Sequence, residues 1–345
     1  VKLESLRIIL ESIINDYQKH LEAGGDRAYQ DSILAQYQVL LALEDYVQGA
    51  FYSNSTREYY AAESSQIYEG AIAATLSMSE EPDMVEAFRI SEKSKSRRLA
   101  EKIQATAQKS TFNLPDSLFQ QEANLAAEVA EVETKLYQAE SVASQADDSL
   151  IRSLNRKLFE LRNVQTSLLD HLQTYYPDYY RLRYSHEVIS LAEVQDSLLG
   201  QVHDALVEYF VGDSMIYTFV VLPDTFHLLS QERDFSMLEW SEEFRCALLA
   251  EQDTALHCTV GYAQTAHRLY ENLFAAVDSL LPPMASVLIV PDGVLGYLSF
   301  ETLLTEPAAE NETYASYSYL LGDHPISYAY SATLQQEMQR KYHQS

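Results

Sequence analysis

The chain has 345 residues, of which 47% are hydrophobic and 22% are charged, so it is long enough to bury the cores of two or three domains. It carries 51 Asp and Glu against 24 Lys and Arg, which gives a formal net charge of −27. This charge argues against nucleic acid as a partner, because phosphate binding requires a cationic surface. No apolar run approaches the ~18 residues that a membrane-spanning helix requires, so we expect no membrane segment.

The two cysteines, Cys246 and Cys258, are too few for a disulfide framework, so we expect reduced side chains that serve only in packing. The chain begins at Val1 and shows no signal-peptide pattern. Together these features predict a cytoplasmic protein of which this chain is a fragment.

Residues 1–110 are predicted to form successive helices, because apolar residues recur there at steps of three and four. The apolar stripes and the polar breaks between them predict helices over residues 3–21, 29–47, 60–76 and 84–103. Pro82 suits the start of the last helix, since proline is tolerated at the first helical position. Paired helices of this length are typical of a tetratricopeptide-like solenoid, so we expect helical repeats that recognise other proteins.

Residues 111–184 are predicted to form a long antiparallel helical hairpin. Apolar residues alternate steps of three and four from Leu125 to Leu136 and again from Leu154 to Leu172, which is the seam of a coiled coil. The small, polar segment 141–148 between them predicts that the chain folds back, giving helices about 40 Å long at ~1.5 Å per residue. Pro177 is expected to end the hairpin. The tyrosines that follow the seam are expected to pack at a domain junction: Tyr175, Tyr176, Tyr179, Tyr180 and Tyr184.

Residues 185–345 read as a mixed α/β region. Short β-rich runs occupy residues 205–211, 215–222, 225–229 and 325–330, and helical patterns occupy residues 236–251 and 261–281 and begin again near residue 331. The run 287–290 is continuously apolar, which predicts a strand buried on both faces, parallel to its neighbours and covered by helices. The predicted fold class is therefore α plus α/β.

No catalytic, metal or cofactor motif stands out: the phosphate-binding, zinc-protease, serine-hydrolase and calcium-binding patterns are all missing. His257 and Cys258, with Cys246, do not make a zinc set. Adjacent residues of a strand also point to opposite faces, so His257 is poorly placed to activate Cys258. His324 is expected to be a solvated loop histidine and not a general base. We predict no catalytic residue, no cofactor and no metal site in this chain.

A basic stripe interrupts the acidic chain, with seven basic against three acidic residues between Glu86 and Ser110. Its candidate docking residues are Lys93, Lys95, Arg97, Arg98 and Lys102. From Tyr184 onward the chain carries five basic against 23 acidic residues, a local charge of −18. The stripe could dock an acidic partner or the acidic region of its own chain, and the second interpretation is favoured. Exposed ion pairs would then make the effect of charge reversal greatest at low salt.

Three segments, residues 86–99, 288–303 and 326–332, resemble the CHAT-domain family, whose caspase-like domain accompanies tetratricopeptide repeats. The motif residues that carry the resemblance are Pro291, Asp292, Gly293, Phe300, Ser327, Tyr328 and Ser331. Their expected roles are structural: a sharp turn at Pro291–Gly293 after a buried strand, an aromatic anchor at Phe300, and a helix cap at Ser331. Ser299 departs from the family pattern, which commonly has proline before the phenylalanine.

The resemblance implies a bacterial cysteine peptidase related to caspases and separase, with a His and a Cys at the ends of neighbouring parallel strands. Those motifs follow the segment that matches Ser327–Ser331 in the family, and this sequence contains no match to them. We therefore expect a non-catalytic portion of such a peptidase, with helical repeats for protein recognition and a partial caspase-like sheet that supports a catalytic half. The alternative is a protein-interaction scaffold with a degenerate caspase-like domain. Partners are expected to be proteins, including a homodimer through an open sheet edge.

Overall fold

The computed structural model describes residues 2–22, 28–49, 54–77, 82–105, 114–141, 148–184, 187–200, 202–234, 236–250, 261–309 and 313–344. The chain divides into two compact units. We call residues 1–82 with 96–188 the helical unit, and residues 83–95 with 189–345 the sheet unit. The sequence places residues 83–95 with the amino-terminal helices, whereas the structure places them with the sheet, because their polar side chains bond there.

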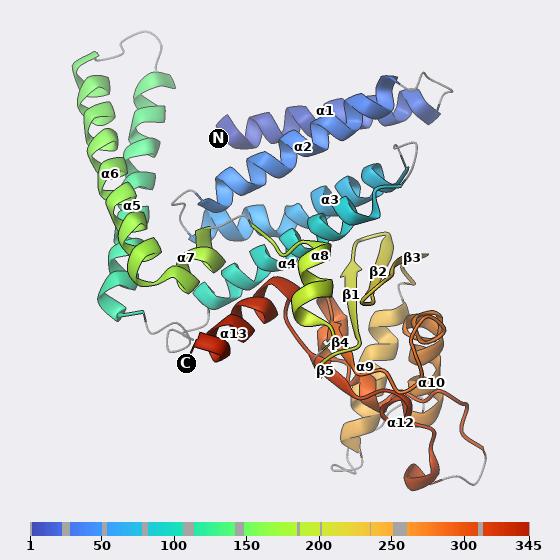
Figure 1. The fold of residues 1–345 in the computed structure, drawn as a ribbon. Helices are drawn as coiled ribbons and strands as arrows, with labels where there is room; N and C mark the ends of the chain where they lie inside the picture. The colour runs from blue at the N-terminus through green and yellow to red at the C-terminus, as the bar shows by residue number, and fades with distance from the viewer. Residues whose placement is uncertain are drawn as a thin grey trace. The chain divides into compact units, whose positions relative to one another are not determined.

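The helical unit begins with α1 (Lys2–Glu22), α2 (Ala28–Gly49) and α3 (Asn54–Ser77), as the apolar periodicity predicts. Each packs against the next (Figure 1), and aliphatic side chains of all three helices are buried. Gly70 permits the close approach of α2 and α3, since a Cβ at this position would overlap the ring and the hydroxyl oxygen of Tyr37. Glycine, which has no Cβ, is therefore favoured where Tyr37 crosses α3.

The predicted hairpin is present as α5 (Asp116–Ser141) and α6 (Asp148–Tyr175), which run side by side in opposite directions (Figure 1). The apolar seam forms its core, with buried Leu125, Val129, Val132, Leu154, Leu158, Leu161, Leu168 and Leu172. The hairpin ends at Tyr175, just before Pro177, as predicted, and Pro177 starts a further short helix, α7 (Pro177–Tyr184). Tyr179 and Tyr184 each donate a hydrogen bond of 2.6 Å to Glu122 of α5, so α7 is fastened to the hairpin.

The sheet unit is built on five strands: β1 (Ala205–Val211), β2 (Met215–Val221), β3 (Phe226–Glu232), β4 (Val287–Val290) and β5 (Ile326–Tyr328). Their order is β3-β2-β1-β4-β5, with β1–β2 and β2–β3 antiparallel and β1–β4 and β4–β5 parallel. Every residue of β4 is buried between parallel neighbours, which confirms the prediction for residues 287–290.

The two faces of the sheet have different covers. On one face, Val207 and Tyr209 of β1 join the main core with side chains from α9 (Ser236–Ala250) and α10 (Tyr262–Leu273). On the other face, Phe88 of α4 (Met84–Ala105) packs against Phe219 and Phe226, with ring centroids 5.7 and 6.1 Å apart. Alternate residues of a strand point to opposite faces, so Glu208 lies on the side of α4.

Short helices complete the sheet unit. They are α8 (Leu191–Glu193), η2 (Val194–Leu198), α11 (Ala275–Asp278), η3 (Gly293–Tyr297), η4 (Phe300–Thr302), η5 (Tyr314–Ser316) and α12 (Leu320–Asp323), followed by the longer α13 (Ala332–Gln344). The chain thus has the predicted α plus α/β composition, with a mixed sheet. Within the described residues, no helix combines the length and the hydropathy needed to span a bilayer.

Cys246, on α9, is disulfide-bonded in the structure, so the expectation of a reduced packing residue is wrong for this side chain. The other cysteine of the chain, Cys258, lies outside the described residues, as does His257. The number of cysteines does not decide whether two sulfur atoms come within bonding distance, because the path of the backbone decides that.

Candidate functional site

The first half of α4, residues 84–95, brings three polar side chains onto the sheet within little more than one helical turn. Ser91 and Glu92 are completely buried and Lys95 is 4% exposed. Residues three and four positions apart in a helix share one side, so Lys95 lies on the same side as Ser91 and Glu92. Charged side chains are rarely buried this deeply without specific partners, which marks this place as a candidate site.

Lys95 binds the ends of two strands. Its Nζ donates to the carbonyl oxygen of Tyr209 in β1 at 2.5 Å and to the carbonyl oxygen of Pro291, directly after β4, at 3.4 Å. Both contacts are to the main chain, and both lie toward the carboxyl ends of these parallel strands, since Tyr209 is the third residue from the end of β1 and Pro291 follows β4. Lys95 therefore fixes the relative position of the two strand ends.

Glu92 binds the amino-terminal end of α13. Its Oε1 accepts from the N–H of Ala332 at 2.9 Å, and its Oε2 accepts from the N–H of Thr333 at 2.9 Å and from the Thr333 hydroxyl at 2.6 Å. A negative charge is stabilising at this end of a helix, because the first N–H groups have no partner within the helix. The Oγ of Ser331 accepts from the N–H of Leu334 at 3.1 Å, which is the capping role that the sequence predicts.

Glu208 is the third charged group at this site and comes from the middle of β1, where it is completely buried. Its Oε1 accepts a hydrogen bond of 2.6 Å from the hydroxyl of Ser91. Burial raises the pKa of Glu208 well above its ordinary value, and the negative charge of Glu92 raises this pKa further, while Lys95 opposes the shift. Glu208 is therefore an acid in a dry environment next to a second carboxyl group.

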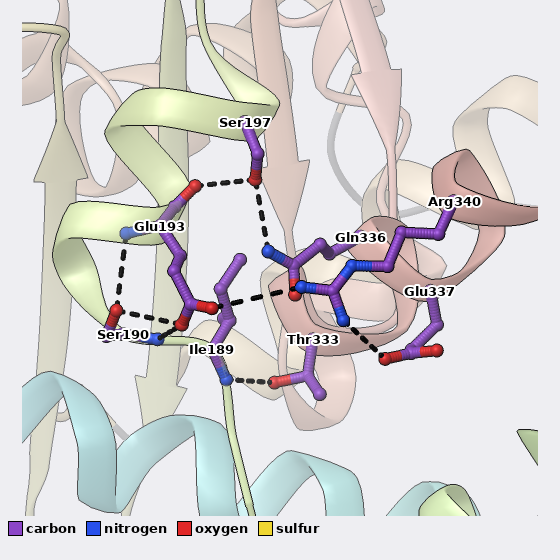
Figure 2. Close-up of polar contacts among 8 residues, drawn as sticks. All are labelled: Ile189, Ser190, Glu193, Ser197, Thr333, Gln336, Glu337 and Arg340. Atoms are coloured by element: carbon purple, nitrogen blue, oxygen red, sulfur yellow. Dashed lines mark hydrogen bonds and ion pairs between the residues drawn. The ribbon is translucent and has the colours of Figure 1, made fainter. Parts of the chain in front are cut away.

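Figure 2 shows how residues 189–197, which include α8, are bonded to α13. The Thr333 hydroxyl, which donates to Glu92, also accepts from the N–H of Ile189 at 3.1 Å. Ser190 and Glu193 form a capping box at the start of α8. Two side chains of α13 reach the same segment: Gln336 donates to Ser197 at 3.1 Å and Arg340 lies 3.9 Å from Glu193. The helix α13 is therefore held by α4 and by residues 189–197, which include α8 and part of η2.

The motif residues after β4 form a rigid turn. Asp292 is 6% exposed, and its Oδ2 accepts from the N–H of Val211, the last residue of β1, at 2.8 Å. Gly293 has a φ of +54°, a conformation that glycine adopts at low cost. The turn thus carries a second link between the ends of β1 and β4, beside the one made by Lys95.

The remaining motif residues have packing and hydrogen-bonding roles. Phe300 is completely buried and packs against Tyr209 and Phe274. Its N–H donates to the hydroxyl of Tyr328 at 2.8 Å, and Tyr328 donates in turn to Glu301. The Oγ of Ser327 lies 3.4 Å from the carbonyl oxygen of Val287 and 3.4 Å from Nδ1 of His203, whose pKa burial lowers.

The basic stripe is only partly described. Lys93 and Lys95 are buried, whereas the side chains of Arg97, Arg98 and Lys102 lie outside the described residues. Lys95 does dock within its own chain, but its hydrogen-bond partners are main-chain carbonyl groups and not acidic side chains. The expectation of exposed, salt-screened ion pairs is therefore wrong for Lys95, because burial removes it from the solvent that screens such pairs.

His324 is not the solvated loop residue that the sequence predicts, since it is only 3% exposed. Its Nδ1 contacts the carbonyl oxygen of Ala285 at 2.9 Å and its Nε2 contacts Oδ1 of Asp278 at 2.8 Å. Asp278 also accepts from the Tyr270 hydroxyl at 2.6 Å. Both ring nitrogens are thus engaged with the protein, which makes His324 a structural link and leaves neither nitrogen open to a substrate.

Sequence reasoning missed four residues of the site: Ser91, Glu92, Glu208 and Thr333. One signal was present, because Glu208 is the single charged residue in the apolar strand Ala205–Val211. An acid in the middle of a buried strand requires a partner from a covering element. The sequence does not identify that partner, because α4 supplies it by docking on the sheet, and no pattern of neighbouring residues predicts this docking.

No protein-family model matches this chain, and a search of curated proteins finds no significant match. Among the described residues, no group of three or more His, Cys, Asp or Glu side chains is arranged to hold a metal ion. The site is therefore characterised by its geometry: two buried carboxyl groups, a buried lysine and a serine, which join α4, two strand ends and α13.

Proposed function

We propose that this chain is the non-catalytic portion of a cysteine peptidase of the CHAT type. In this proposal the helical unit contains tetratricopeptide-like repeats that recognise other proteins. The sheet unit belongs to a caspase-like domain and supports a catalytic half that carries the His and the Cys. The resemblance of residues 86–99, 288–303 and 326–332 to that family is the starting point.

One observation carries the proposal: the three resembling segments contact one another although they are far apart in sequence. Lys95 of the first segment donates to Pro291 of the second at 3.4 Å. Glu92 of the first accepts from Ala332 of the third at 2.9 Å. Segments that identify one family are expected to build one structural element, and these contacts support that expectation.

The position of these contacts also supports a role next to a catalytic centre. Lys95 and the Pro291–Gly293 turn lie at the carboxyl ends of β1 and β4. In open α/β sheets, functional groups gather beyond the carboxyl ends of the parallel strands. A lysine and an aspartate that immobilise this end of the sheet would keep neighbouring catalytic groups in position.

The shared helix α4 supports the link to protein recognition. Residues 84–95 of α4 belong to the sheet unit and residues 96–105 to the helical unit. A partner that binds the helical unit and displaces α4 would strain the bonds of Glu92 and Lys95. In this way binding at one unit would change the strand ends of the other.

Peptide cleavage by the complete natural gene product tests the proposal. We expect the gene product to cleave peptides, the 345-residue chain alone to be inactive, and Lys95→Met to reduce cleavage at least about tenfold, as expected when a support of the catalytic geometry is lost. The matched control is Lys135→Met, since Lys135 is 56% exposed on α5 and pairs with Glu131 of its own helix. Cleavage by the chain alone, abolished by Cys246→Ala or Cys258→Ala, would contradict the proposed division of roles.

A scaffold is the second candidate, and exposed apolar side chains on the hairpin favour it. Phe159 and Tyr175 of α6 are 66% and 67% exposed, and Val164 is 48% exposed. A gene product that cleaves no peptide, but retains a protein partner that Phe159→Ser releases, would favour the scaffold over the peptidase.

A further inference from the structure

Glu92 and Glu208 form a buried pair of carboxyl groups in the sheet unit, and this pair is independent of the function proposed above. Both side chains are completely buried, one on α4 and one on β1. The hydroxyl of Ser91, the residue before Glu92, lies 2.6 Å from Oε1 of Glu208, and Glu92 raises the pKa of Glu208 through its charge and as a side-chain hydrogen-bond partner. A hydrogen bond between two carboxyl groups requires one of them to keep its proton, because an ionised carboxylate has no proton to donate.

Glu92 and Glu208 accept different numbers of hydrogen bonds. Glu92 accepts three hydrogen bonds, from the N–H groups of Ala332 and Thr333 and from the Thr333 hydroxyl. Glu208 accepts one, at Oε1 from Ser91. The Oε2 atom of Glu208 is buried and receives no donor. Glu92 thus has the surroundings of an anion, and Glu208 has those of an acid.

We propose that Glu208 is protonated at Oε2 in the folded protein and donates this proton to the carboxylate of Glu92, so that one shared proton holds the first half of α4 on the sheet. The proton supplies the missing partner of Oε2. It also converts a contact between two like charges into a charge-assisted hydrogen bond, which is stronger than a neutral one.

The charge balance of the site agrees with this assignment. The charged groups that act on Glu208 are Glu92 and Lys95, both on α4, and Ser91 is its neutral partner. With Glu208 protonated, the negative Glu92 and the positive Lys95 cancel. Without the proton the site would hold a net negative charge away from water, which is costly. The raised pKa of Glu208 is consistent with the neutral form.

The proposal predicts that the stability of the sheet unit falls as the pH rises. An unfolded chain loses the proton of Glu208 near its ordinary pKa of about 4.3, whereas the folded protein keeps it to a higher pH. Between these two values the folded state binds one proton more than the unfolded state. The unfolding equilibrium constant should therefore rise by up to about tenfold per pH unit in this range, and the contribution is lost once the pH passes the folded pKa.

Urea unfolding of the full chain at several pH values tests this, with three proteins compared: wild type, Glu208→Gln and Glu232→Gln. In Glu208→Gln the introduced amide keeps the shape of the protonated acid and can donate to Glu92 at every pH. We expect Glu208→Gln to remove this pH dependence and to be more stable than wild type at high pH. Glu232 lies on β3 of the same sheet and is exposed, so Glu232→Gln should follow wild type.

Two further measurements test whether the pH dependence of stability arises at Glu208 and in the first half of α4. Infrared spectra of the wild type should contain the carbonyl band of a protonated carboxylic acid well above a pH of about 4.3, and Glu208→Gln should lack this band. Hydrogen exchange, corrected for the intrinsic effect of pH, should show residues 84–95 losing protection as that band disappears. Loss of protection in Glu208→Gln over the same pH range would contradict the proposal.

The opposite assignment is an ionised Glu208 that is balanced by Lys95. In that case Glu208→Gln would be less stable than wild type at high pH, or would fail to fold, and no protonated-acid band would be lost. Each of these results would overturn the proposal.

Discussion

Two buried glutamates, one in each unit, show that acidic groups hidden from water differ in the number of hydrogen bonds they accept. In the helical unit, Glu122 is 5% exposed, and each of its oxygens accepts a hydrogen bond of 2.6 Å, from Tyr179 and from Tyr184. In the sheet unit, Glu208 is completely buried, and only one of its oxygens has a donor. Burial alone therefore does not define the role of a buried acid, because the number of donors differs.

The two units also differ in the kind of contact that holds a helix against the element next to it. The α5–α6 hairpin associates through a continuous apolar seam, in which many equivalent contacts share the free energy. The first half of α4 docks through Phe88 and a few polar side chains, each of which has one or two specific partner residues. A polar contact of this kind is specific, and the loss of one member leaves the others buried without partners.

The largest expected effect comes from Lys95→Met, which removes the positive charge from the sheet site. Glu92 would remain buried without its compensating charge, and the carbonyl oxygen of Tyr209 would lose its donor. We expect a loss of about 3–5 kcal/mol of unfolding free energy, the range for removing one member of a buried charged set. The loss should be nearly equal at low and high salt in urea unfolding, since the site is screened from ions.

The matched control for that measurement is Lys135→Met, because Lys135 makes an exposed ion pair with Glu131 on α5. This change should cost no more than about 1 kcal/mol, and less as the salt concentration rises. Equal losses for Lys95→Met and Lys135→Met would contradict the buried position of Lys95.

Glu122→Gln sharpens the contrast between the two glutamates. The substitution replaces one of the two acceptor oxygens by an NH₂ group, which cannot accept a hydrogen bond. At least one of the hydrogen bonds that Tyr179 and Tyr184 donate is therefore lost. We expect the unfolding free energy to fall by about 1–3 kcal/mol at neutral pH. Glu208→Gln should change the stability in the opposite direction at high pH, and the same sign for both substitutions would contradict the comparison.

Ser91→Ala has the smallest expected effect and tests the single donor of Glu208. The lost hydrogen bond should cost about 1 kcal/mol. Because the bond from Ser91 lowers the pKa of Glu208, its removal should raise this pKa further. The fall in stability with rising pH should then extend to higher pH, as followed by urea unfolding. A shift to lower pH would show that Ser91 does not stabilise the ionised form.

Much of the fold could be predicted from local patterns. Steps of three and four located the helices and the seam of the hairpin, and the continuously apolar run 287–290 indicated a parallel strand between parallel neighbours. The cap at Ser331 also followed from its position before a helix. These features depend on residues that are close in sequence, so their physical causes are visible there.

The candidate site could not be predicted in this way. The basic residues near Lys95 indicated a charged surface, whereas Lys95 is buried on main-chain carbonyl groups that lie 114 and 196 positions away in the chain. His324 stood in a polar turn, and the fold buried it against Asp278, which lies 46 positions away. In each case the deciding partner comes from a distant element, so no local pattern could reveal it.

Local periodicity was enough to locate most of the helices and strands and their apolar faces, because these depend on neighbouring residues. The folded chain was needed to show that residues 83–95 belong to the sheet unit, and that Ser91 meets Glu208 across 117 positions of chain. A buried polar group is satisfied by partners that folding brings to it, and those partners leave no periodic signal near it in the chain.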